Sequence, residues 1–297
     1  RVRHRKMAGF DGKARTPRRP ETTGNRSHRG HRLAVCSRPP HRPAPAMHTI
    51  DLNSDLGESF GAWSMGDDVA LLGVVTSANI ACGFHAGDPS TIRHTVLRAI
   101  AHNVAVGAHP SLPDLQGFGR RRMDVSPSDV YDLVLYQIGA VAAFARAGHG
   151  RLHHVKPHGA LYHMAASDPA IARAVATVAR DFDPDLVLYG LAGGAQAVAG
   201  EALGMAVAAE VFADRAYRRD GSLVPRGEPG AMIDAESRAV EQALELVRDR
   251  RVLSIDGVWV PVVADPICVH GDHPSAVSLA RALRAAFERE GIGLRAC

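Results

Sequence analysis

The sequence has little cysteine, and its cysteines are not arranged to cross-link a fold. The four thiols stand at positions 36, 82, 268 and 297, and no two of them form a C-x-x-C pair. This spacing argues against a disulfide framework and against a zinc ribbon. Cys82 and Cys268 lie in apolar runs, where a thiol packs as a small hydrophobic group. Free thiols suit a reducing compartment, and we expect the protein to be cytoplasmic.

Several signatures of membrane proteins and of common enzyme classes are also missing. No apolar run reaches the roughly 18 residues of a membrane span, and no secretory apolar segment follows the basic start. The pattern G-x-x-x-x-G-K-[ST] is absent, which excludes a P-loop for ATP. The absence of G-x-S-x-G disfavours a serine hydrolase, and no H-E-x-x-H zinc motif occurs.

Lysine is almost absent beyond residue 46. Lys156 is the only lysine in residues 47–297, which hold 21 arginines. With 22 basic and 29 acidic side chains this region is mildly acidic and has no basic stripe, so we expect no binding to nucleic acid. Lysine presents a compact charge where arginine presents a planar fork, so a lone lysine two residues from His158 points to a specific role.

Residues 1–46 differ in composition from everything that follows. They carry 13 basic and two acidic side chains, are rich in Arg, His and Pro, and are poor in aromatics. Such a segment cannot bury enough apolar surface to offset its ordering entropy, so we expect a disordered basic extension. We favour sequence lying ahead of a start at Met47 over a basic arm for nucleic acid or a targeting peptide. Residues 47–297 are expected to form a single catalytic domain.

From residue 47 onward, apolar strand-like runs alternate with amphipathic helical runs. About seven such units in about 250 residues predict a TIM-like α/β barrel, written (β/α), with parallel strands; an open doubly wound sheet is the alternative. Asp256-Gly257 predicts a two-stranded hairpin within residues 252–263. The expected strands are Thr49–Asn53, Ser77–Ala81, Val104–Ala108, Leu152–Val155, Leu186–Tyr189, Ala206–Val211 and Pro266–Val269, and the expected helices are 89–102, 127–147, 169–182, 193–203, 234–249 and 274–290.

Four of the helix starts are marked by a proline at the first helical position. They are Asp88-Pro89, Ser126-Pro127, Asp168-Pro169 and His273-Pro274. In the first three, a residue that can cap the helix stands directly before the proline. Asp88 is therefore expected first of all to be a helix cap.

Polar side chains gather at the end of every expected strand but one, or directly after it. In a parallel α/β barrel the carboxyl ends of all strands lie on one rim, where active sites are built. We therefore expect these side chains to converge. They are Asn53, Asp55 and Glu58; Asn79, His85 and Asp88; His109; Lys156 and His158; Glu210, Asp214 and Arg215; and His270 and Asp272.

The rim thus combines histidines and carboxylates with one lysine. A single loop histidine is more often a hydrogen-bonded surface residue than a ligand, so the inference rests on the convergence. Lys156 can bind an anion or take part in proton transfer, and histidine can act as acid or base near neutrality. A set of His and Asp side chains can also hold a divalent metal that activates water. The run Arg120–Arg122 is expected to be a solvated patch, although its glycine-bearing loop can fold over a ligand.

These clusters, in this order, resemble the LamB/YcsF family. The resemblance extends from Met47 to the C-terminus and includes none of the preceding residues. Its motifs are long and ordered, which makes chance similarity very improbable. They are DLNSDLGESFG (51–61), NIACGFHAGDP (79–89), GAHPSLPDLQGFGRR (107–121), HVKPHGALYH (154–163), EVFADRAYRRDGSLVPR (210–226) and ICVHGD (267–272).

The resemblance implies a barrel of about seven strands related to glycoside hydrolase and polysaccharide deacetylase barrels. It implies a hydrolase acting on the carbon–nitrogen bond of a cyclic amide, which opens 5-oxo-L-proline to L-glutamate in an ATP-dependent reaction. Two further subunits, B and C, are implied as partners, and ATP is used by the complex. The missing P-loop is consistent with a complex in which other subunits bind ATP. Ser54 stands where the family usually has Cys, and Ser111 where it usually has Gly, so no cysteine nucleophile is available at position 54.

For the reaction that the resemblance implies, we assign provisional roles to the rim residues. Asp55, His85, Lys156 and His158 are the expected catalytic residues, and Asp55, His85 and His158 are also the candidates for a divalent metal. Lys156 or Arg215 is expected to pair with anionic groups. The expected substrate-binding residues are Asn53, Glu58, His109, Glu210, Asp214, Arg215, His270 and Asp272.

Two other functions remain open at this point. The first is a metal-dependent deacetylase or amidohydrolase on the same barrel that needs no ATP. The second is a non-catalytic subunit that presents a lactam to its partners, which the density of His and acidic residues on the rim argues against.

Overall fold

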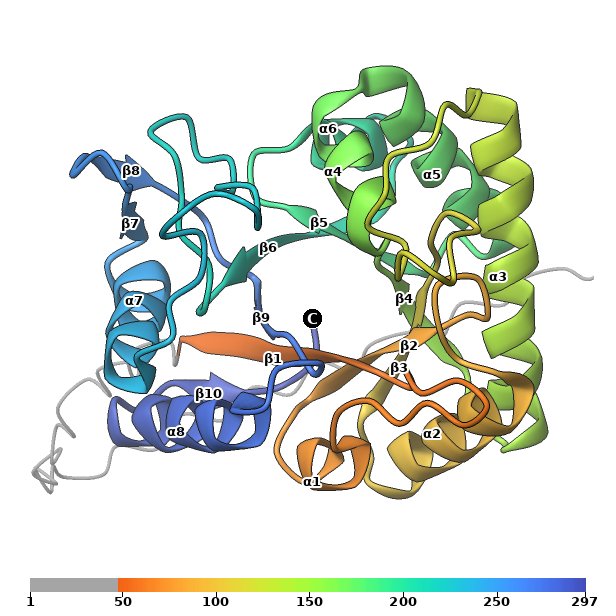
Figure 1. Cartoon of the computed structure of the whole chain (residues 1–297), viewed down its shortest axis with the longest axis horizontal. Helices are drawn as coiled ribbons and strands as arrows, with labels where there is room; N and C mark the ends of the chain where they lie inside the picture. Colours follow the sequence, from red (N-terminus) through yellow and green to blue (C-terminus); the bar gives the residue numbers. More distant parts are fainter. Residues whose placement is uncertain (1–47) are drawn as a thin grey trace, which may run out of the picture. The chain divides into compact units, whose positions relative to one another are not determined.

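The computed structural model describes residues 48–297, so the prediction of a disordered extension over residues 1–46 lies outside the described part. In that part, parallel strands close into a barrel through the pairing of residues 51–54 with residues 266–269 (Figure 1). This confirms the TIM-like barrel and rules out the open doubly wound sheet. The barrel strands are β1 (Thr49–Leu56), β2 (Ser77–Ala81), β3 (Ala105–His109), β4 (Leu152–Val155), β5 (Val187–Leu191), β6 (Ala206–Phe212) and β9 (Pro266–Val269).

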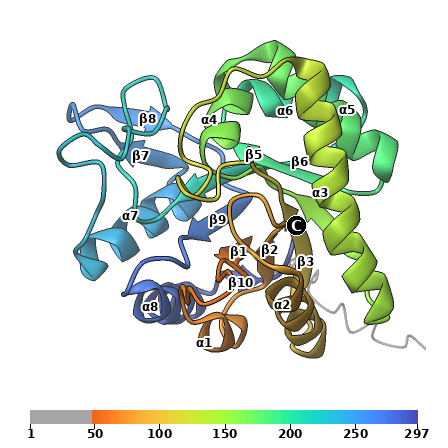
Figure 2. The same cartoon turned by 45° about the vertical axis from the view of Figure 1, so that its right-hand side comes forward.

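Helices between the strands surround the barrel, as Figure 2 shows. Their apolar faces pack on the outer faces of the strands, which forms one continuous hydrophobic core. The helices are α1 (Asp68–Leu72), α2 (Pro89–Ala101), α3 (Pro127–Ala147), α4 (Gly159–Ser167), α5 (Pro169–Phe182), α6 (Ala195–Ala202), α7 (Glu236–Arg248) and α8 (Ala276–Arg289).

Three of the four predicted proline starts are confirmed. Asp88, Ser126 and Asp168 each accept hydrogen bonds from backbone N–H groups of the first helical turn. The fourth was wrong: His273 and Pro274 lie in a turn, and α8 begins at Ala276. In this turn the N–H of Ala276 donates to the carbonyl of His273, which closes the chain on itself before the helix starts.

The remaining differences from the predicted elements concern short segments. Helices α1 and α4 were not predicted, because five and nine residues give too little periodicity to reveal a helix. The hairpin is confirmed: β7 (Arg251–Leu253) pairs antiparallel with β8 (Trp259–Pro261). A two-residue strand, β10 (Gly293–Leu294), pairs with the start of β1.

By length and composition alone, α3 is the one helix in residues 48–297 that is apolar enough to cross a membrane. Its residues Val130, Val134, Ile138 and Val141 are fully buried against the rest of the barrel. Because this stripe follows helical spacing and faces the core, its hydrophobicity is explained by packing.

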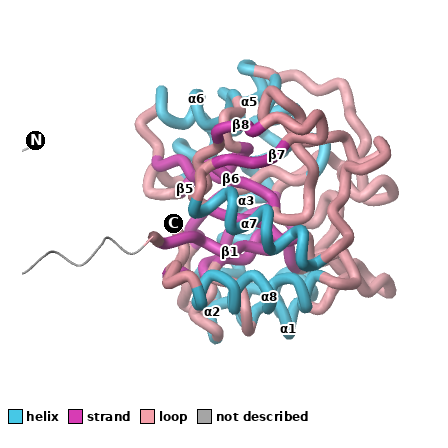
Figure 3. Tube along the Cα trace, turned by 90° about the vertical axis from the view of Figure 1, so that its left-hand side faces the viewer, coloured by secondary structure: helices cyan, strands magenta, loops and turns pink. Residues whose placement is uncertain are grey.

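The long loops gather at one end of the barrel, opposite the C-terminus (Figure 3). These loops follow the carboxyl ends of the strands, as the parallel topology requires. The predicted polar clusters therefore lie at this end.

Candidate active site

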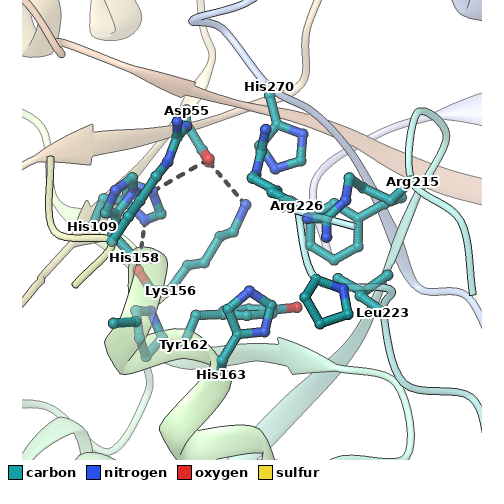
Figure 4. Close-up of a pocket in the computed structure, with 17 residues that line it drawn as sticks. Asp55, His109, Lys156, His158, Tyr162, His163, Arg215, Leu223, Arg226 and His270 are labelled. Carbon is teal, nitrogen blue, oxygen red and sulfur yellow. Dashed lines mark hydrogen bonds and ion pairs between the residues drawn. The ribbon is translucent and has the colours of Figure 1, made fainter. Parts of the chain in front are cut away.

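A cavity of about 330 Å³ lies at the carboxyl ends of the barrel strands (Figure 4). Its side chains come from the ends of β1, β3, β4, β6 and β9, from α4 and from the loop after β6. Six of the site residues expected from the sequence line it. They are Asp55, His109, Lys156, His158, Arg215 and His270.

Lys156 follows β4 and is only 2% exposed. Its ammonium group donates to Asp55 Oδ1 at 2.8 Å and lies 3.0 Å from Glu210 Oε1. Burial alone would lower the pKa of Lys156, but the charges of Asp55 and Glu210 outweigh it and raise the pKa well above its usual value. Lys156 is therefore a fixed positive charge inside the barrel mouth.

Asp55, at the end of β1, is the carboxylate nearest to that charge. Its Oδ1 also accepts from Asn79 Nδ2 at 2.8 Å, and its Oδ2 lies 3.3 Å from His109 Nε2. Burial raises the pKa of Asp55, but His109 and Lys156 hold it well below the usual range. The group is thus an ionised carboxylate that faces the cavity.

A buried network of hydrogen bonds holds Lys156 and Asp55 in place. Asn53 donates to Glu210 Oε1 at 3.1 Å and accepts from Asn79 at 2.7 Å. His154 Nε2 bonds to the side-chain oxygen of Asn79 at 2.8 Å. Asn53 and Glu210, which the sequence suggested for substrate binding, do not line the cavity and instead hold Lys156 in place.

His109 and His158 face each other beside Asp55. The Nδ1 of His109 lies 2.7 Å from the carbonyl oxygen of Lys156, and the Nε2 of His158 lies 2.9 Å from that of Phe118. The other nitrogens, His109 Nε2 and His158 Nδ1, are 3.0 Å apart. Gly119, with a φ of +66°, permits this close approach, since a Cβ there would lie 2.9 Å from His158 and would clash with Ser111 Oγ.

His85 and Glu58 lie behind these two histidines. The His85 ring stacks on that of His158 at 3.8 Å between centroids, and its Nε2 lies 3.2 Å from Glu58 Oε1. Burial lowers the pKa of His85 and of His158 well below the usual value and raises that of Glu58. Glu58, His85, His109 and His158 form a group that can hold a metal ion, with donor atoms within 4.8 Å of one another.

We call Asp55, Glu58, His85, His109 and His158 the histidine wall. Every one of these side chains hydrogen-bonds or ion-pairs with another member of the wall. The wall is therefore assembled before any ligand binds.

The opposite side of the cavity is cationic. Arg215 is 2% exposed and donates to the carbonyl of Val224 at 2.6 Å, while its Nε has no hydrogen-bond partner among the described residues. Within residues 48–297, neither Arg215 nor Arg226 forms an ion pair with a carboxylate. Burial and the neighbouring Arg226 lower the pKa of Arg215 to about 10, so it stays charged at neutral pH.

Two histidines complete this side. Burial, together with Arg215 and Arg226, lowers the pKa of His163 to about 4, which leaves it neutral. His270 Nδ1 is held by Asp214 at 2.9 Å. We call Arg215, Arg226, His163 and His270 the arginine wall; Figure 4 shows Arg215 and Arg226 on the side of the cavity away from His109.

Three other residues from the sequence prediction lie away from the cavity. Asp214 orients His270, and Asp272 pairs with Arg120 at 2.6 Å. Asp88 caps α2 and also accepts from the N–H of Gly61 at 2.9 Å. Arg120 lines the cavity, so the loop that carries it does reach the site.

The serine at position 54 is part of the barrel wall. Its hydroxyl donates to the carbonyl of Val269 at 2.7 Å, and the residue is fully buried. Ser54 therefore offers no nucleophile to the cavity.

Sequence reasoning did not assign a role to Tyr162, His163 or Arg226, which also line the cavity. Tyr162 stands four residues after His158, the N-cap of α4, and this spacing places both on one side of the helix. The spacing of His158 and Tyr162 would therefore indicate a cavity position for Tyr162 in any sequence analysis that places a helix at α4. Arg226 lies in the irregular loop after β6, where no helical or strand periodicity indicates which way its side chain points.

Residues 50–297 match the LamB/YcsF family. A curated relative from Bordetella pertussis, named as the A subunit of 5-oxoprolinase, is 59% identical over 247 residues, which are 83% of this chain and 98% of that protein. A relative of the same name from Geobacillus kaustophilus is 56% identical over 250 residues, or 84% and 97% of the two chains.

Among solved structures, the lactam utilization protein from Thermus thermophilus is similar along the same region. It is 48% identical, with a TM-score of 0.80, and the match covers 84% of this chain and 100% of that one. The similarity thus extends over the barrel and its rim loops together.

Proposed function

The chain belongs to the LamB/YcsF family, and we propose that it is the A subunit of a 5-oxoprolinase. In this proposal it opens the lactam of 5-oxo-L-proline to L-glutamate, within a complex that contains subunits B and C and uses ATP. Close relatives that carry this name over nearly their whole length support the proposal. Because the sequence has no P-loop, we assign the handling of ATP to the partners.

The observation that carries the proposal is the division of the cavity into two walls. 5-Oxo-L-proline has a carboxylate at one end and an amide at the other. Arg215 and Arg226, which have no carboxylate partner within residues 48–297, suit the carboxylate. The amide would then lie toward Lys156 and the histidine wall.

At the amide end, Lys156 supplies positive charge where negative charge develops on the lactam oxygen. Asp55 takes a proton from the attacking water and returns it to the ring nitrogen as the carbon–nitrogen bond breaks. His109 and His158 hold that water beside Asp55, and His85 supports His158 by stacking. Water thus adds to the carbonyl carbon, and its second proton passes to the released nitrogen, so the products are a carboxylate and an ammonium group.

The test is glutamate release from 5-oxoproline by this chain mixed with candidate B and C subunits, with and without ATP. We expect glutamate only when ATP and all three subunits are present. Arg173, exposed on α5, gives a matched control, and Arg173→Gln should leave the rate unchanged. An assembled complex that forms no glutamate would refute the assignment.

A metal-dependent amidohydrolase is the second candidate, because four histidine and glutamate side chains form a group able to hold a metal. It predicts that the isolated chain hydrolyses N-acetylated sugars or amides without ATP, and that a chelator abolishes this. If the chain binds 5-oxoproline but variants of the rim leave the complex's turnover intact, a non-catalytic binding role is indicated instead.

We also propose that the protein works in the cytoplasm. The buried free thiols of Cys82 and Cys268 support this, since they suit a reducing environment. Fractionation of cells that express the tagged chain would test it.

A further inference from the structure

The hydrogen bonds of His109 and His158 determine which nitrogen of each ring carries the proton. A carbonyl oxygen only accepts hydrogen bonds, so His109 Nδ1 and His158 Nε2, which contact carbonyls, must both be protonated. If no further proton is bound to either ring, His109 Nε2 and His158 Nδ1 each present a lone pair. These two atoms face each other at 3.0 Å. Two lone pairs at this distance repel unless a positive charge lies between them.

The distance fits a shared metal ion. Two nitrogen ligands about 2.0–2.1 Å from one zinc ion lie about 3.0–3.4 Å apart at ligand angles near 95–110°. The two rings are nearly perpendicular, at 85°, so they approach from different directions. Histidines that bind metals usually donate their other N–H to a carbonyl or carboxylate, which both rings do here.

Glu58 supplies an anionic ligand at the same point. Its Oε1 lies 3.5 Å from His158 Nδ1. His85 is stacked parallel to His158, at 5°, so an ion in the plane of the His158 ring is out of the plane of the His85 ring. His85 Nε2 instead lies 3.2 Å from Glu58 Oε1 and can orient that carboxylate.

We propose that His109 Nε2, His158 Nδ1 and Glu58 form a binding site for a divalent ion of the zinc class, and that His85 positions Glu58. Two neutral imidazoles and one carboxylate are a common set for zinc with one open coordination position. His109 and His158 line the cavity, whereas Glu58 and His85 do not, so the open position faces the cavity. A bound ion would polarise a water or carbonyl oxygen there.

The alternative is a proton shared between the two rings, with His109 as an imidazolium beside Asp55. Asp55 Oδ2, at 3.3 Å from His109 Nε2, suits that arrangement too. Measuring bound metal distinguishes the metal site from the shared proton, because only the metal site binds one ion per chain.

The experiment uses the full chain, freed of metal by chelator, with Zn²⁺ and Co²⁺ as probes. Binding is followed by calorimetry, by the Co²⁺ absorption spectrum and by metal content after dialysis. His109→Asn keeps a donor to the Lys156 carbonyl, and His158→Gln keeps one to the Phe118 carbonyl, so each removes only the ligand nitrogen. His94→Gln, exposed on α2, is the matched control.

We expect one ion per chain in the wild type and in His94→Gln, and at least about 100-fold weaker binding in His109→Asn, His158→Gln and Glu58→Gln. His85→Phe keeps the stacked ring and should weaken binding about 10–100-fold, as loss of a positioning group does. Zn²⁺ should also raise the unfolding temperature of the wild type, a readout that needs no variant.

No ion in the wild type, or equal affinity in the His109, His158 and His94 variants, would overturn the site. A ¹⁵N spectrum that shows His109 as an imidazolium in the presence of Zn²⁺ would do the same. None of these readouts involves glutamate formation, so they decide the ion site separately from the proposed ring opening.

Discussion

The two walls of the cavity are built on different principles. In the histidine wall every side chain already has a partner, and backbone carbonyls fix the orientation of His109 and His158. In the arginine wall, Arg215 and Arg226 have no carboxylate partner in the part of the chain that the structure describes. A preassembled wall suits chemistry, since its groups need no reorganisation during reaction. A wall with unpaired cations suits recognition, because an anionic ligand completes it.

Lys156 lines the cavity and pairs with Asp55 of the histidine wall, and its removal should have the largest effect. Lys156→Met leaves Asp55 and Glu210 as buried carboxylates without their counter-charge, which typically destabilises a fold by about 3–5 kcal/mol. We expect loss of measurable glutamate formation and a lower unfolding temperature.

Lys156→Arg sharpens this prediction, because it keeps the charge but replaces a compact ammonium by a planar fork. We expect it to be folded and at least about 100-fold slower in glutamate release. Full activity of Lys156→Arg would contradict the role given to the lysine.

The next largest effect is expected within the histidine wall. Asp55→Asn keeps the shape and the acceptor for Lys156 but removes the base, so kcat should fall about 10²–10⁴-fold. KM for 5-oxoproline should change little, since Asp55 does not contact the substrate carboxylate in this proposal. Steady-state kinetics of the complex separate the two constants, and a change in KM alone would place Asp55 in binding.

The arginine wall should give the opposite pattern. Arg226→Gln removes one charged hydrogen bond, worth about 1.5–3 kcal/mol, and should raise KM for 5-oxoproline about 10–100-fold with kcat nearly unchanged. For 2-pyrrolidinone, the same ring without a carboxylate, the variant and the wild type should turn over equally. A drop in kcat with both lactams would remove the distinction between the walls.

The smallest effect is expected from Asp88, which lies outside the cavity and accepts hydrogen bonds from Gly61 and from the start of α2. Asp88→Ala should cost about 1 kcal/mol of folding free energy. Backbone hydrogen bonds, first that of Gly61, lower the pKa of Asp88 from 3.8 to about 2.

The sign of the pH dependence follows from that lowered pKa. Stabilisation by the ionised carboxylate is complete above the unfolded value of 3.8 and is lost as the pH falls through about 2. Thermal unfolding of wild type and Asp88→Ala should therefore differ by a constant amount above about pH 4 and converge near pH 2. An equal difference at all pH values would show that the cap does not depend on its charge.

The sequence by itself determined the strand and helix order, because hydrophobic periodicity and caps such as Asp88 and Ser126 act locally. It also determined that Asp55, His109, Lys156 and His158 would meet, since parallel strands bring their carboxyl ends to one rim.

Tertiary structure alone decided what each of these residues touches. The orientation of the His158 ring toward His109 depends on the carbonyl of Phe118, which a loop 40 residues away in the chain brings to His158. The arginine wall depends on the fold of the loop after β6, and the orientation of Arg226 there has no periodic signal. Such contacts join residues distant in sequence, so their geometry is fixed only when the barrel closes and the loops pack against one another.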